Sequence, residues 1–250
     1  MSKKLTSEYV KKEYNRQVKA DYGGNYEYNR WFASSESKLG YEMHKASQKF
    51  HTKDITFKSY LEFGVGPGTW TEMFVKSGAK FTLLDISKEM LNLAKKRFKS
   101  RKNIKYVVGN MLNLRKKNEF DFVFSSRAIK YIPNKEKLFK VIYDSMKDNG
   151  NCVVINQSCD TFMQRIYRLF GIKSNDTLHQ GGITISELKR IFKKTGFKEV
   201  ELYPVEIKVG IPGVVIFKTL SKWIWKMFYK HELNFLSTLL SGSYLVKMKK

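Results

Sequence analysis

Residues 61–69 have the composition of a loop that binds a nucleotide-like ligand. They read Leu-Glu-Phe-Gly-Val-Gly-Pro-Gly-Thr. The apolar run before the glycines predicts a short buried strand, and the residues after them predict a helix over 69–77. Glycines at alternate positions let the backbone turn tightly and approach a ligand, while the start of a helix offers free N–H groups. The segment therefore predicts a strand, a glycine loop and a helix around a bound ligand.

An acid at the end of the next predicted strand narrows this ligand to one that carries a ribose. Residues 80–84 are strand-like and lead into Asp85, which lies 23 positions after Glu62. The spacing puts the carboxylate at the tip of the neighbouring parallel strand, where it can accept hydrogen bonds from both ribose hydroxyls. The glycines run G-x-G-x-G and no P-loop lysine follows them, so neither NAD nor ATP is favoured.

The glycine loop and five later segments together resemble the class I S-adenosylmethionine-dependent methyltransferases, whose first motif is E-x-G-x-G-x-G. In chain order, the later segments that resemble family motifs are Leu83-Leu84-Asp85-Ile86-Ser87 with Met90-Leu91, Val108-Gly109-Asn110-Met111, Phe120-Asp121-Phe122-Val123-Phe124-Ser125-Ser126, Met146-Lys147-Asp148-Asn149-Gly150 and Lys194-Thr195-Gly196-Phe197. Several motif matches in the family's order are far more specific evidence for the family than any single match. The resemblance covers residues 57–203.

The resemblance implies S-adenosylmethionine as the cofactor. The cofactor-binding residues that it implies are Glu62, Gly64, Gly66, Gly68, Asp85, Ile86, Met90, Asn110, Met111 and Ser125, with Tyr14, Tyr22 and Arg30 from the N-terminal segment. Asn110 stands where an aspartate usually accepts a hydrogen bond from the adenine amino group, and an amide carbonyl can still accept it. His44 and His51 lack a matching cluster of Cys, His or carboxylate, so no metal is expected.

The chemistry of a sulfonium methyl donor asks little of the protein beyond alignment of a nucleophile with the S–CH₃ bond and exclusion of water. A general base helps an amine or hydroxyl acceptor. Candidates for the catalytic residues are Arg127, Lys130 and Tyr131 near the fourth strand, and His179 in a later loop. Tyr131 stands where many relatives carry a histidine, and the alternative for His179 is a loop residue with no role.

Strand-like and helical segments alternate from residue 58 onward, which predicts an α/β fold with a mostly parallel sheet and helices on both faces. The strands are expected at 58–63, 80–84, 104–109, 120–125, 151–157 and 198–206, and the helices near 69–77, 87–99, 134–148 and 186–195. The third helix is expected to end at Asp148-Asn149-Gly150. The resemblance adds an antiparallel seventh strand at 243–249.

One decorated domain is expected from 250 residues. Residues 57–250 would form the methyltransferase domain, with a helical insertion at 211–240. Residues 1–56 read as helical and rich in aromatics. The resemblance implies that this extension folds over the pocket as a lid, and the alternative is a packing helix that covers the sheet edge. Cys152 and Cys159 are too few for a disulfide framework.

The net charge of +24 favours anionic partners, although lysines dispersed over solvated helix faces give the same charge. The tip of the fourth strand lacks the [DNS]-P-P-[YFW] sequence with which relatives methylate base amines, so base methylation of nucleic acid is less favoured. We expect methyl transfer to an O or N atom of a small-molecule or lipid-linked acceptor. The alternatives are a tRNA or rRNA methyltransferase that uses the basic surface, and a non-catalytic protein that keeps the fold as a scaffold.

The C-terminal insertion has a repeating pattern of lysines. Lys218, Lys222, Lys226 and Lys230 form one stripe on a helix, and its other side carries Phe217, Leu220, Trp223, Ile224, Met227 and Phe228. Such a helix suits peripheral contact, through 214–230, with an anionic membrane. The alternative is that the apolar side packs on the domain. With no apolar stretch long enough to span a bilayer and no signal sequence, the protein is expected in the cytoplasm, at the membrane surface if this contact forms.

Overall fold

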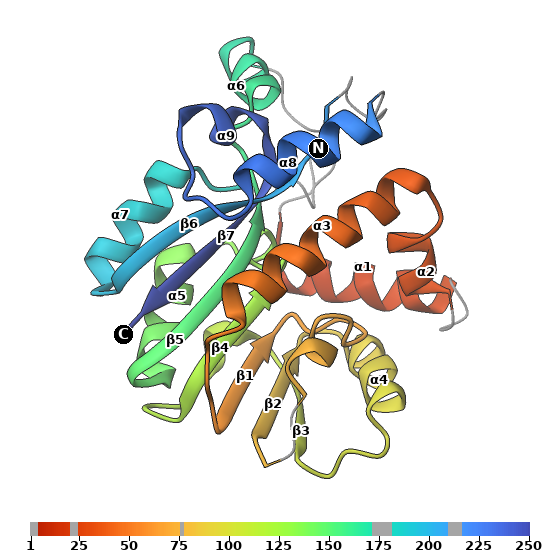
Figure 1. Ribbon diagram of the computed structural model, residues 1–250. Coiled ribbons are helices and arrows are strands. Elements are labelled where there is room, and N and C mark those ends of the chain that lie inside the picture. Colours follow the sequence, from red (N-terminus) through yellow and green to blue (C-terminus); the bar gives the residue numbers. More distant parts are fainter. Residues whose placement is uncertain (1–4, 21–24, 76–77, 172–181, 210–216) are drawn as a thin grey trace.

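The computed structural model describes residues 5–20, 25–75, 78–171, 182–209 and 217–250. Its centre is a seven-stranded sheet in the order β3-β2-β1-β4-β5-β7-β6 (Figure 1). The strands are β1 (Ser59–Phe63), β2 (Lys80–Asp85), β3 (Ile104–Val108), β4 (Phe120–Ser126), β5 (Met146–Gln157), β6 (Lys198–Ile207) and β7 (Ser241–Lys249). Only β7 runs against its neighbours, so the predicted mostly parallel sheet with an antiparallel last strand is confirmed.

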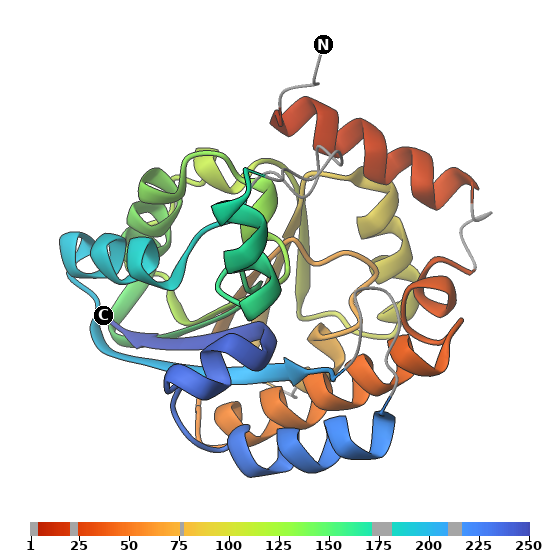
Figure 2. The ribbon, with the colours of Figure 1, turned by 90° about the horizontal axis from the view of Figure 1, so that it is seen from above.

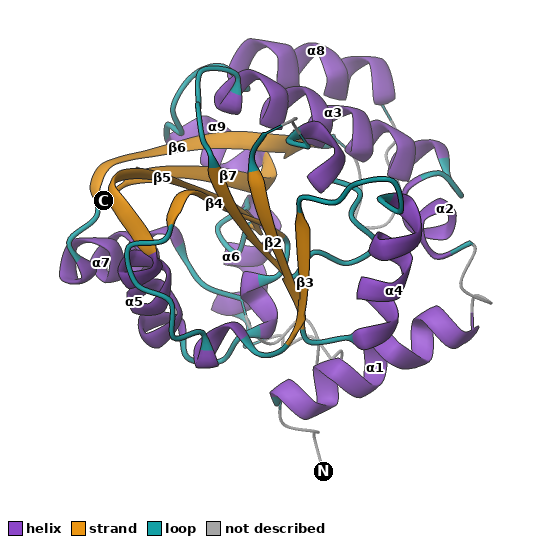
Figure 3. Ribbon diagram, turned by 90° about the horizontal axis from the view of Figure 1, so that it is seen from below, coloured by secondary structure: helices purple, strands orange, loops and turns teal. Residues whose placement is uncertain are grey.

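Helices cover both faces of the sheet, as predicted (Figures 1 and 3). Those within the core domain are α4 (Lys88–Arg97), α5 (Lys135–Ser145), α6 (Phe162–Leu169) and α7 (Ile185–Thr195). Alternate residues of each strand point to opposite faces. In β1, Leu61 and Phe63 therefore join the apolar cluster under α5 and α7, while Tyr60 joins the cluster under α4. The sequence analysis did not predict α6.

The expected helix over 69–77 is wrong. The described part of this segment forms only a short 3-10 turn, η1 (Thr71–Met73). Trp70, Thr71 and Phe74 are all buried, and the hydroxyl of Thr71 is directed to the buried carboxylate of Glu62. Buried side chains at the adjacent positions Trp70 and Thr71 do not fit the periodicity of an amphipathic helix, so the chain forms only a turn here.

The helix expected over 134–148 is also shorter than predicted. It ends as α5 at Ser145, and β5 begins at Met146. Met146 is fully buried and pairs with Phe120 of β4 ahead of a register shift. Burial of the methionine within the sheet outweighs continuation of the helix, and Asn149, at φ 60°, lies within the strand instead of ending the helix.

The N-terminal extension forms α1 (Ser7–Ala20), α2 (Tyr26–Trp31) and α3 (Ser35–Thr52). Figures 1 and 2 show α1 lying across the end of the sheet toward which the parallel strands point. The described part of the C-terminal insertion forms α8 (Lys218–Phe228) and α9 (Phe235–Leu240). None of the described helices is long and apolar enough to cross a membrane.

Candidate functional site

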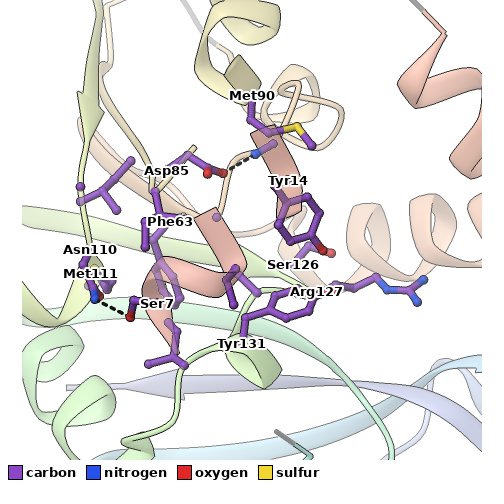
Figure 4. Close-up of a pocket in the computed structure, with 18 of the residues that line it drawn as sticks. Ser7, Tyr14, Phe63, Asp85, Met90, Asn110, Met111, Ser126, Arg127 and Tyr131 are labelled. Atoms are coloured by element: carbon purple, nitrogen blue, oxygen red, sulfur yellow. Dashed lines mark hydrogen bonds between the residues drawn. The ribbon is translucent and has the colours of Figure 1, made fainter. Parts of the chain in front are cut away.

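A pocket opens at the carboxyl ends of the central strands, under α1 and α2, where ligands bind in open α/β sheets. It encloses about 710 Å³ of empty space, part of which is open to solvent. Figure 4 shows Ser7, Asn110 and Met111 at one end and Arg127 and Tyr131 toward the other. Its lining includes most of the residues that the sequence indicated: Tyr14, Arg30, Gly64, Gly66, Asp85, Ile86, Met90, Asn110, Met111, Arg127 and Tyr131.

Asp85 ends β2 and holds the glycine loop in place. Its Oδ2 accepts a hydrogen bond from the backbone N–H of Gly66 at 2.8 Å, and its Oδ1 accepts one from the N–H of Ser87, also at 2.8 Å. Burial raises the pKa of the carboxyl group, and these backbone donors oppose the shift. Each oxygen keeps a further lone pair, so the carboxylate can still accept hydrogen bonds from ribose hydroxyls.

Two glycines of the loop have different surroundings, although both have positive φ. Gly64, at φ 67°, packs so closely that an added Cβ would lie 2.2 Å from the Cβ of Ala128. Gly66, at φ 57°, has no atom within 4 Å of the position of an added Cβ. Gly64 is therefore needed for packing, while Gly66 leaves open space on the ligand side of the loop.

Three residues expected to bind the cofactor do not line the pocket. Glu62 is buried beneath the loop, where its Oε2 accepts hydrogen bonds from the hydroxyls of Tyr60 and Thr71 at 2.8 and 2.7 Å. Gly68 packs against the ring of Phe98. The hydroxyl of Ser125 donates to the carbonyl of Phe63. These residues shape the loop and the strand ends from below.

Burial changes the charge state of Glu62. It raises the pKa of this carboxyl group to about 7, even though the two hydroxyl donors favour the ionised form. A protonated Glu62 at mildly acidic pH lowers the cost of holding a carboxyl group in the core.

Asn110 begins a short turn at the end of β3 and connects the pocket to α1. Its Oδ1 accepts a hydrogen bond from the N–H of Leu112 at 3.0 Å, and its Nδ2 donates to the hydroxyl of Ser7 at 2.9 Å. An aspartate at this position has no hydrogen to donate. The amide thus adds a bond to the N-terminal helix and keeps a free lone pair on its oxygen for an adenine amino group.

The other end of the pocket gathers phenol and guanidinium groups from three segments. Tyr14 of α1 and Tyr131 after β4 meet edge to face, with ring centroids 5.4 Å apart, and a hydrogen bond joins their hydroxyls. Arg30 of α2 donates from a terminal nitrogen to the hydroxyl of Tyr26 at 2.9 Å. Arg127 lies next to this group. This end of the pocket therefore presents hydrogen-bond donors and positive charge.

The candidate bases differ in how well they suit that role. Arg127 keeps its proton at any physiological pH, although burial lowers its pKa. Burial raises the pKa of Tyr131, which keeps the phenol protonated near neutral pH. Lys130 lies outside the pocket lining and donates to the side chain of Gln157. His179 and Tyr22 lie outside the described residues. None of the placed candidates is a ready proton acceptor.

Sequence reasoning missed several lining residues. They are Ser7, Val10, Tyr26, Phe63, Leu84, Gly109, Ser126, Ala128 and Ile132. Two of them carried a usable signal. Tyr26 precedes Arg30 by four positions, the spacing of helix neighbours, and strand alternation places Ser126 on the opposite side from Ser125. Among the described residues, no group of His, Cys, Asp and Glu could hold a metal ion.

Comparison with known proteins agrees with this arrangement. Residues 61–150 match the family model described as a methyltransferase domain. The chain is 25% identical over 133 residues to malonyl-[acyl-carrier protein] O-methyltransferase 2 of Ilyobacter polytropus, covering 52% of this chain and 51% of that protein. It is 26% identical over 190 residues to the demethylmenaquinone methyltransferase of Staphylococcus saprophyticus, covering 66% of this chain and 82% of the relative. The chain thus spans about half the length of the first relative.

A solved structure shares the whole fold. It is an S-adenosylmethionine-dependent methyltransferase, a possible histamine N-methyltransferase, from Thermotoga maritima, with a TM-score of 0.65 and 19% identity. The match covers 95% of this chain and 98% of that one. The matched domain contains the glycine loop, Asp85 and Asn110, at the strand ends where the family's motifs lie. Residues 61–150 therefore carry the methyltransferase domain that this family model describes, and the chain shares the fold of the solved methyltransferase structure.

Proposed function

We propose that the protein transfers the methyl group of S-adenosylmethionine to an oxygen or nitrogen atom of a small-molecule or lipid-linked acceptor. The observation that carries this proposal is the pocket, which joins a ribose-binding acid and a glycine loop to a chamber roofed by α1 and α2. The malonyl-[acyl-carrier protein] and demethylmenaquinone methyltransferases are relatives whose names specify such acceptors.

The cofactor contacts follow from the lining residues. Asp85 accepts hydrogen bonds from the ribose hydroxyls, and Gly66 lets the backbone approach the ligand. Asn110 accepts a hydrogen bond from the adenine amino group beside the apolar side chain of Met111. Arg30 binds the carboxylate of the methionine moiety, since a guanidinium group fits a carboxylate with two parallel hydrogen bonds. Residues 1–56 act as the lid, because Tyr14 and Arg30 come from α1 and α2.

The transfer itself requires alignment more than proton chemistry. A lone pair of the acceptor attacks the methyl carbon, and the carbon–sulfur bond breaks with its electron pair left on sulfur, giving S-adenosylhomocysteine. An amine acceptor then releases its proton to water, and an acceptor that is already ionised has none to release. The hydrogen bond between the hydroxyls of Tyr14 and Tyr131 uses one of their two hydrogens, and the remaining O–H can donate to the acceptor and position it. This explains how a pocket without a ready base among its described residues can catalyse the reaction.

Transfer of a labelled methyl group tests the proposal. The protein is incubated with methyl-tritiated S-adenosylmethionine and, separately, with a polar small-molecule extract, a lipid extract and total RNA. We expect label in the small-molecule or lipid fraction, and none with Asp85→Ala. Label confined to RNA would favour the alternative acceptor, and failure of wild type to bind the cofactor or its demethylated product would overturn the proposal.

We also propose that one surface contacts an anionic membrane. Apolar side chains are exposed on α6, α8 and α9, among them Trp223 at 60% and Phe235 at 74%. All three helices lie at the end of the molecule that holds the pocket (Figures 1 and 2). The buried side of α8 is centred on Trp225, which donates to the carbonyl of Val205. The predicted apolar side of this helix is therefore divided, because Leu220, Trp223 and Met227 stay exposed.

The lysines of α8 complete that surface. Lys218 donates to a serine of α3, Lys222 forms an ion pair with Glu42 at 3.5 Å, and Lys226 is exposed beside them. Exposed lysines beside tryptophan and leucine suit the interface of a bilayer that carries anionic lipids. A lipid-linked acceptor would then reach the pocket from the membrane surface.

Vesicle sedimentation tests the membrane contact. We expect binding to vesicles with anionic lipid, none to neutral vesicles, and loss of binding when Lys218, Lys222, Lys226 and Lys230 are changed to glutamine. The control changes four exposed lysines near the opposite end of the strands: Lys53, Lys58, Lys80 and Lys102. Equal loss of vesicle binding in both variants would mean that binding depends only on the net charge of the protein. Absence of vesicle binding at low salt would overturn the proposed membrane contact.

A further inference from the structure

Two guanidinium groups approach the same indole at one end of the pocket. The guanidinium carbon of Arg30 lies 5.4 Å from the ring centroid of Trp31, and that of Arg127 lies 5.5 Å from it. Both arginines line the pocket. Trp31 is buried, so the two cations share an apolar wall instead of a solvated surface. Placing like charges together in this way is costly unless an anion completes the site.

Arg127 lacks the anion that would balance it. Within the described part of the chain its side chain makes no hydrogen bond or ion pair, and its Nε is buried without a partner. The carboxylate whose charge acts on it is Glu206. That carboxylate is already bound by the ring of His44 at 3.3 Å and by the ammonium group of Lys208. A half-buried guanidinium group that lacks a partner in a pocket indicates a missing anionic ligand.

The backbone at Arg127 points to the same conclusion. The residue follows β4 with φ at 62°, in the left-handed region, which costs about 1 kcal/mol for a residue other than glycine. Its N–H donates to the carbonyl of Ile155 at 2.7 Å, which fixes the turn. The turn therefore holds a long cationic side chain at the tip of a central strand, directed away from the adenine end (Figure 4).

The cofactor cannot balance both arginines. The described lining contains one carboxylate, Asp85, against Arg30 and Arg127. Bound S-adenosylmethionine adds an ammonium, a carboxylate and a sulfonium group, which together carry one net positive charge. Its carboxylate can pair with Arg30, and this leaves Arg127 unpaired near a sulfonium. Among the described residues and the cofactor, no further anion is left for Arg127, so an anion on the second substrate would balance the filled pocket.

We propose that the methyl acceptor carries a carboxylate or phosphate group and that Arg127 binds it. This inference rests on the proposed function and adds the charge class of the substrate. Arg127 offers a planar pair of N–H donors that match either group. The hydrogen-bonded pair of Tyr14 and Tyr131 lies beside it and keeps one O–H free to donate to the acceptor. The positive field of this end also draws an anionic acceptor toward the cofactor.

Anion titration of the protein saturated with S-adenosylhomocysteine tests the proposal. The probes are acetate, inorganic phosphate and a short-chain phosphatidic acid, measured by calorimetry. We expect at least one to bind, and Arg127→Met to weaken it about tenfold or more, as removal of one charged hydrogen-bonded partner does. Arg127→Lys should retain part of the affinity. The matched control is Arg101→Met, which removes an exposed charge and should change affinity less than twofold.

The comparison of probes identifies the class of acceptor. Preference for acetate indicates a carboxylate, preference for phosphate a phosphate monoester, and preference for the phosphatidic acid a lipid phosphate. Equal anion affinity in wild type and Arg127→Met, or no anion binding to wild type that binds the cofactor product, would overturn the inference alone. Failure to bind the cofactor product would instead overturn the proposed function, and titration of the cofactor-free protein then decides whether Arg127 binds anions.

Discussion

The two ends of the pocket are built by different means. At the cofactor end, Asp85 and Asn110 sit at strand tips, and each already has hydrogen-bond partners within the protein. At the acceptor end, Arg127 lies in a turn after β4 and lacks a hydrogen bond or ion pair within the described structure. The polar groups of the cofactor end therefore have partners before the cofactor binds. The guanidinium group of the acceptor end gains its partner only when the acceptor binds.

This difference separates what the fold requires from what the substrate requires. The cofactor end reuses backbone geometry that the sheet already provides, since parallel strands end at one edge beside a glycine loop. The acceptor end adds charge that stability alone would disfavour, because a half-buried cation without a partner destabilises the folded state. Substitutions in the glycine loop at the cofactor end should therefore lower stability, while substitution of Arg127 at the acceptor end should weaken acceptor binding without lowering stability.

The largest effect is expected from the glycine at the base of the loop. Gly64→Ala should lower the free energy of unfolding by about 4 kcal/mol, since it combines left-handed strain with a clash against Ala128. Gly66→Ala should cost only about 1 kcal/mol, from strain, but should weaken cofactor binding, because its Cβ enters the pocket. Urea unfolding and calorimetry measure the two quantities. Equal unfolding costs in both variants would contradict the assignment of Gly64 to packing.

A large effect on binding is expected at Asp85. Asp85→Asn removes the charge and one acceptor, and hydrogen bonds to charged groups contribute about 1.5–3 kcal/mol each. We expect affinity for S-adenosylhomocysteine to fall about 100-fold, with far-UV circular dichroism unchanged. The control is Asp148→Asn, at a surface position with 84% side-chain exposure, which should bind like wild type. A change below tenfold would contradict ribose recognition by this carboxylate.

A smaller effect, dependent on pH, is expected at Glu62. Its folded-state pKa of about 7 exceeds the unfolded value, so between pH 4.5 and 7 the folded state binds more protons than the unfolded state. The free energy of unfolding therefore falls as pH rises through this window. Glu62→Gln removes that fall, and its advantage over wild type should grow from near zero at pH 4.5 to about 3 kcal/mol at about pH 8.

Urea unfolding across this pH range measures the difference. Glu232→Gln, at an exposed position, serves as the control and should show no such trend. A difference between Glu62→Gln and wild type that is constant with pH would contradict a buried, protonated carboxyl group.

The smallest effect is expected from salt. A single anionic group bound by the half-buried Arg127 should lose only about twofold to threefold in affinity between about 50 and 200 mM salt, because screening acts weakly on partly buried pairs. An RNA acceptor bound across the basic surface would lose a factor of ten or more over the same range. The Michaelis constant of the acceptor, measured at both salt concentrations, distinguishes the two. A steep salt dependence of the Michaelis constant would contradict a distinct acceptor end of the pocket, since the acceptor would then bind over the protein surface.

Most of the sheet and the cofactor end could be predicted from the sequence, because strand periodicity and the glycine spacing are local signals. The helix expected over 69–77 could not, since the burial of Trp70 and Phe74 depends on tertiary packing. The pairing of Met146 with Phe120 likewise could not be predicted from the local sequence pattern. The hydroxyl of Ser125 is bound to the carbonyl of Phe63 outside the pocket lining, which the motif could not indicate, because motif position does not state which way a strand residue points. Arg127 was indicated as catalytic, but its lack of a partner is visible only once the chain is folded.

The position of Trp31 gives this pocket a built-in optical reporter. Its indole lies within cation–π distance of both guanidinium groups and packs edge to face on Trp70, with ring centroids 5.4 Å apart. An anion that draws either guanidinium group away from the ring changes the field at the indole. Fluorescence emission should therefore follow occupancy of the acceptor end directly, without turnover, and allow acceptors to be screened on the native chain by equilibrium titration.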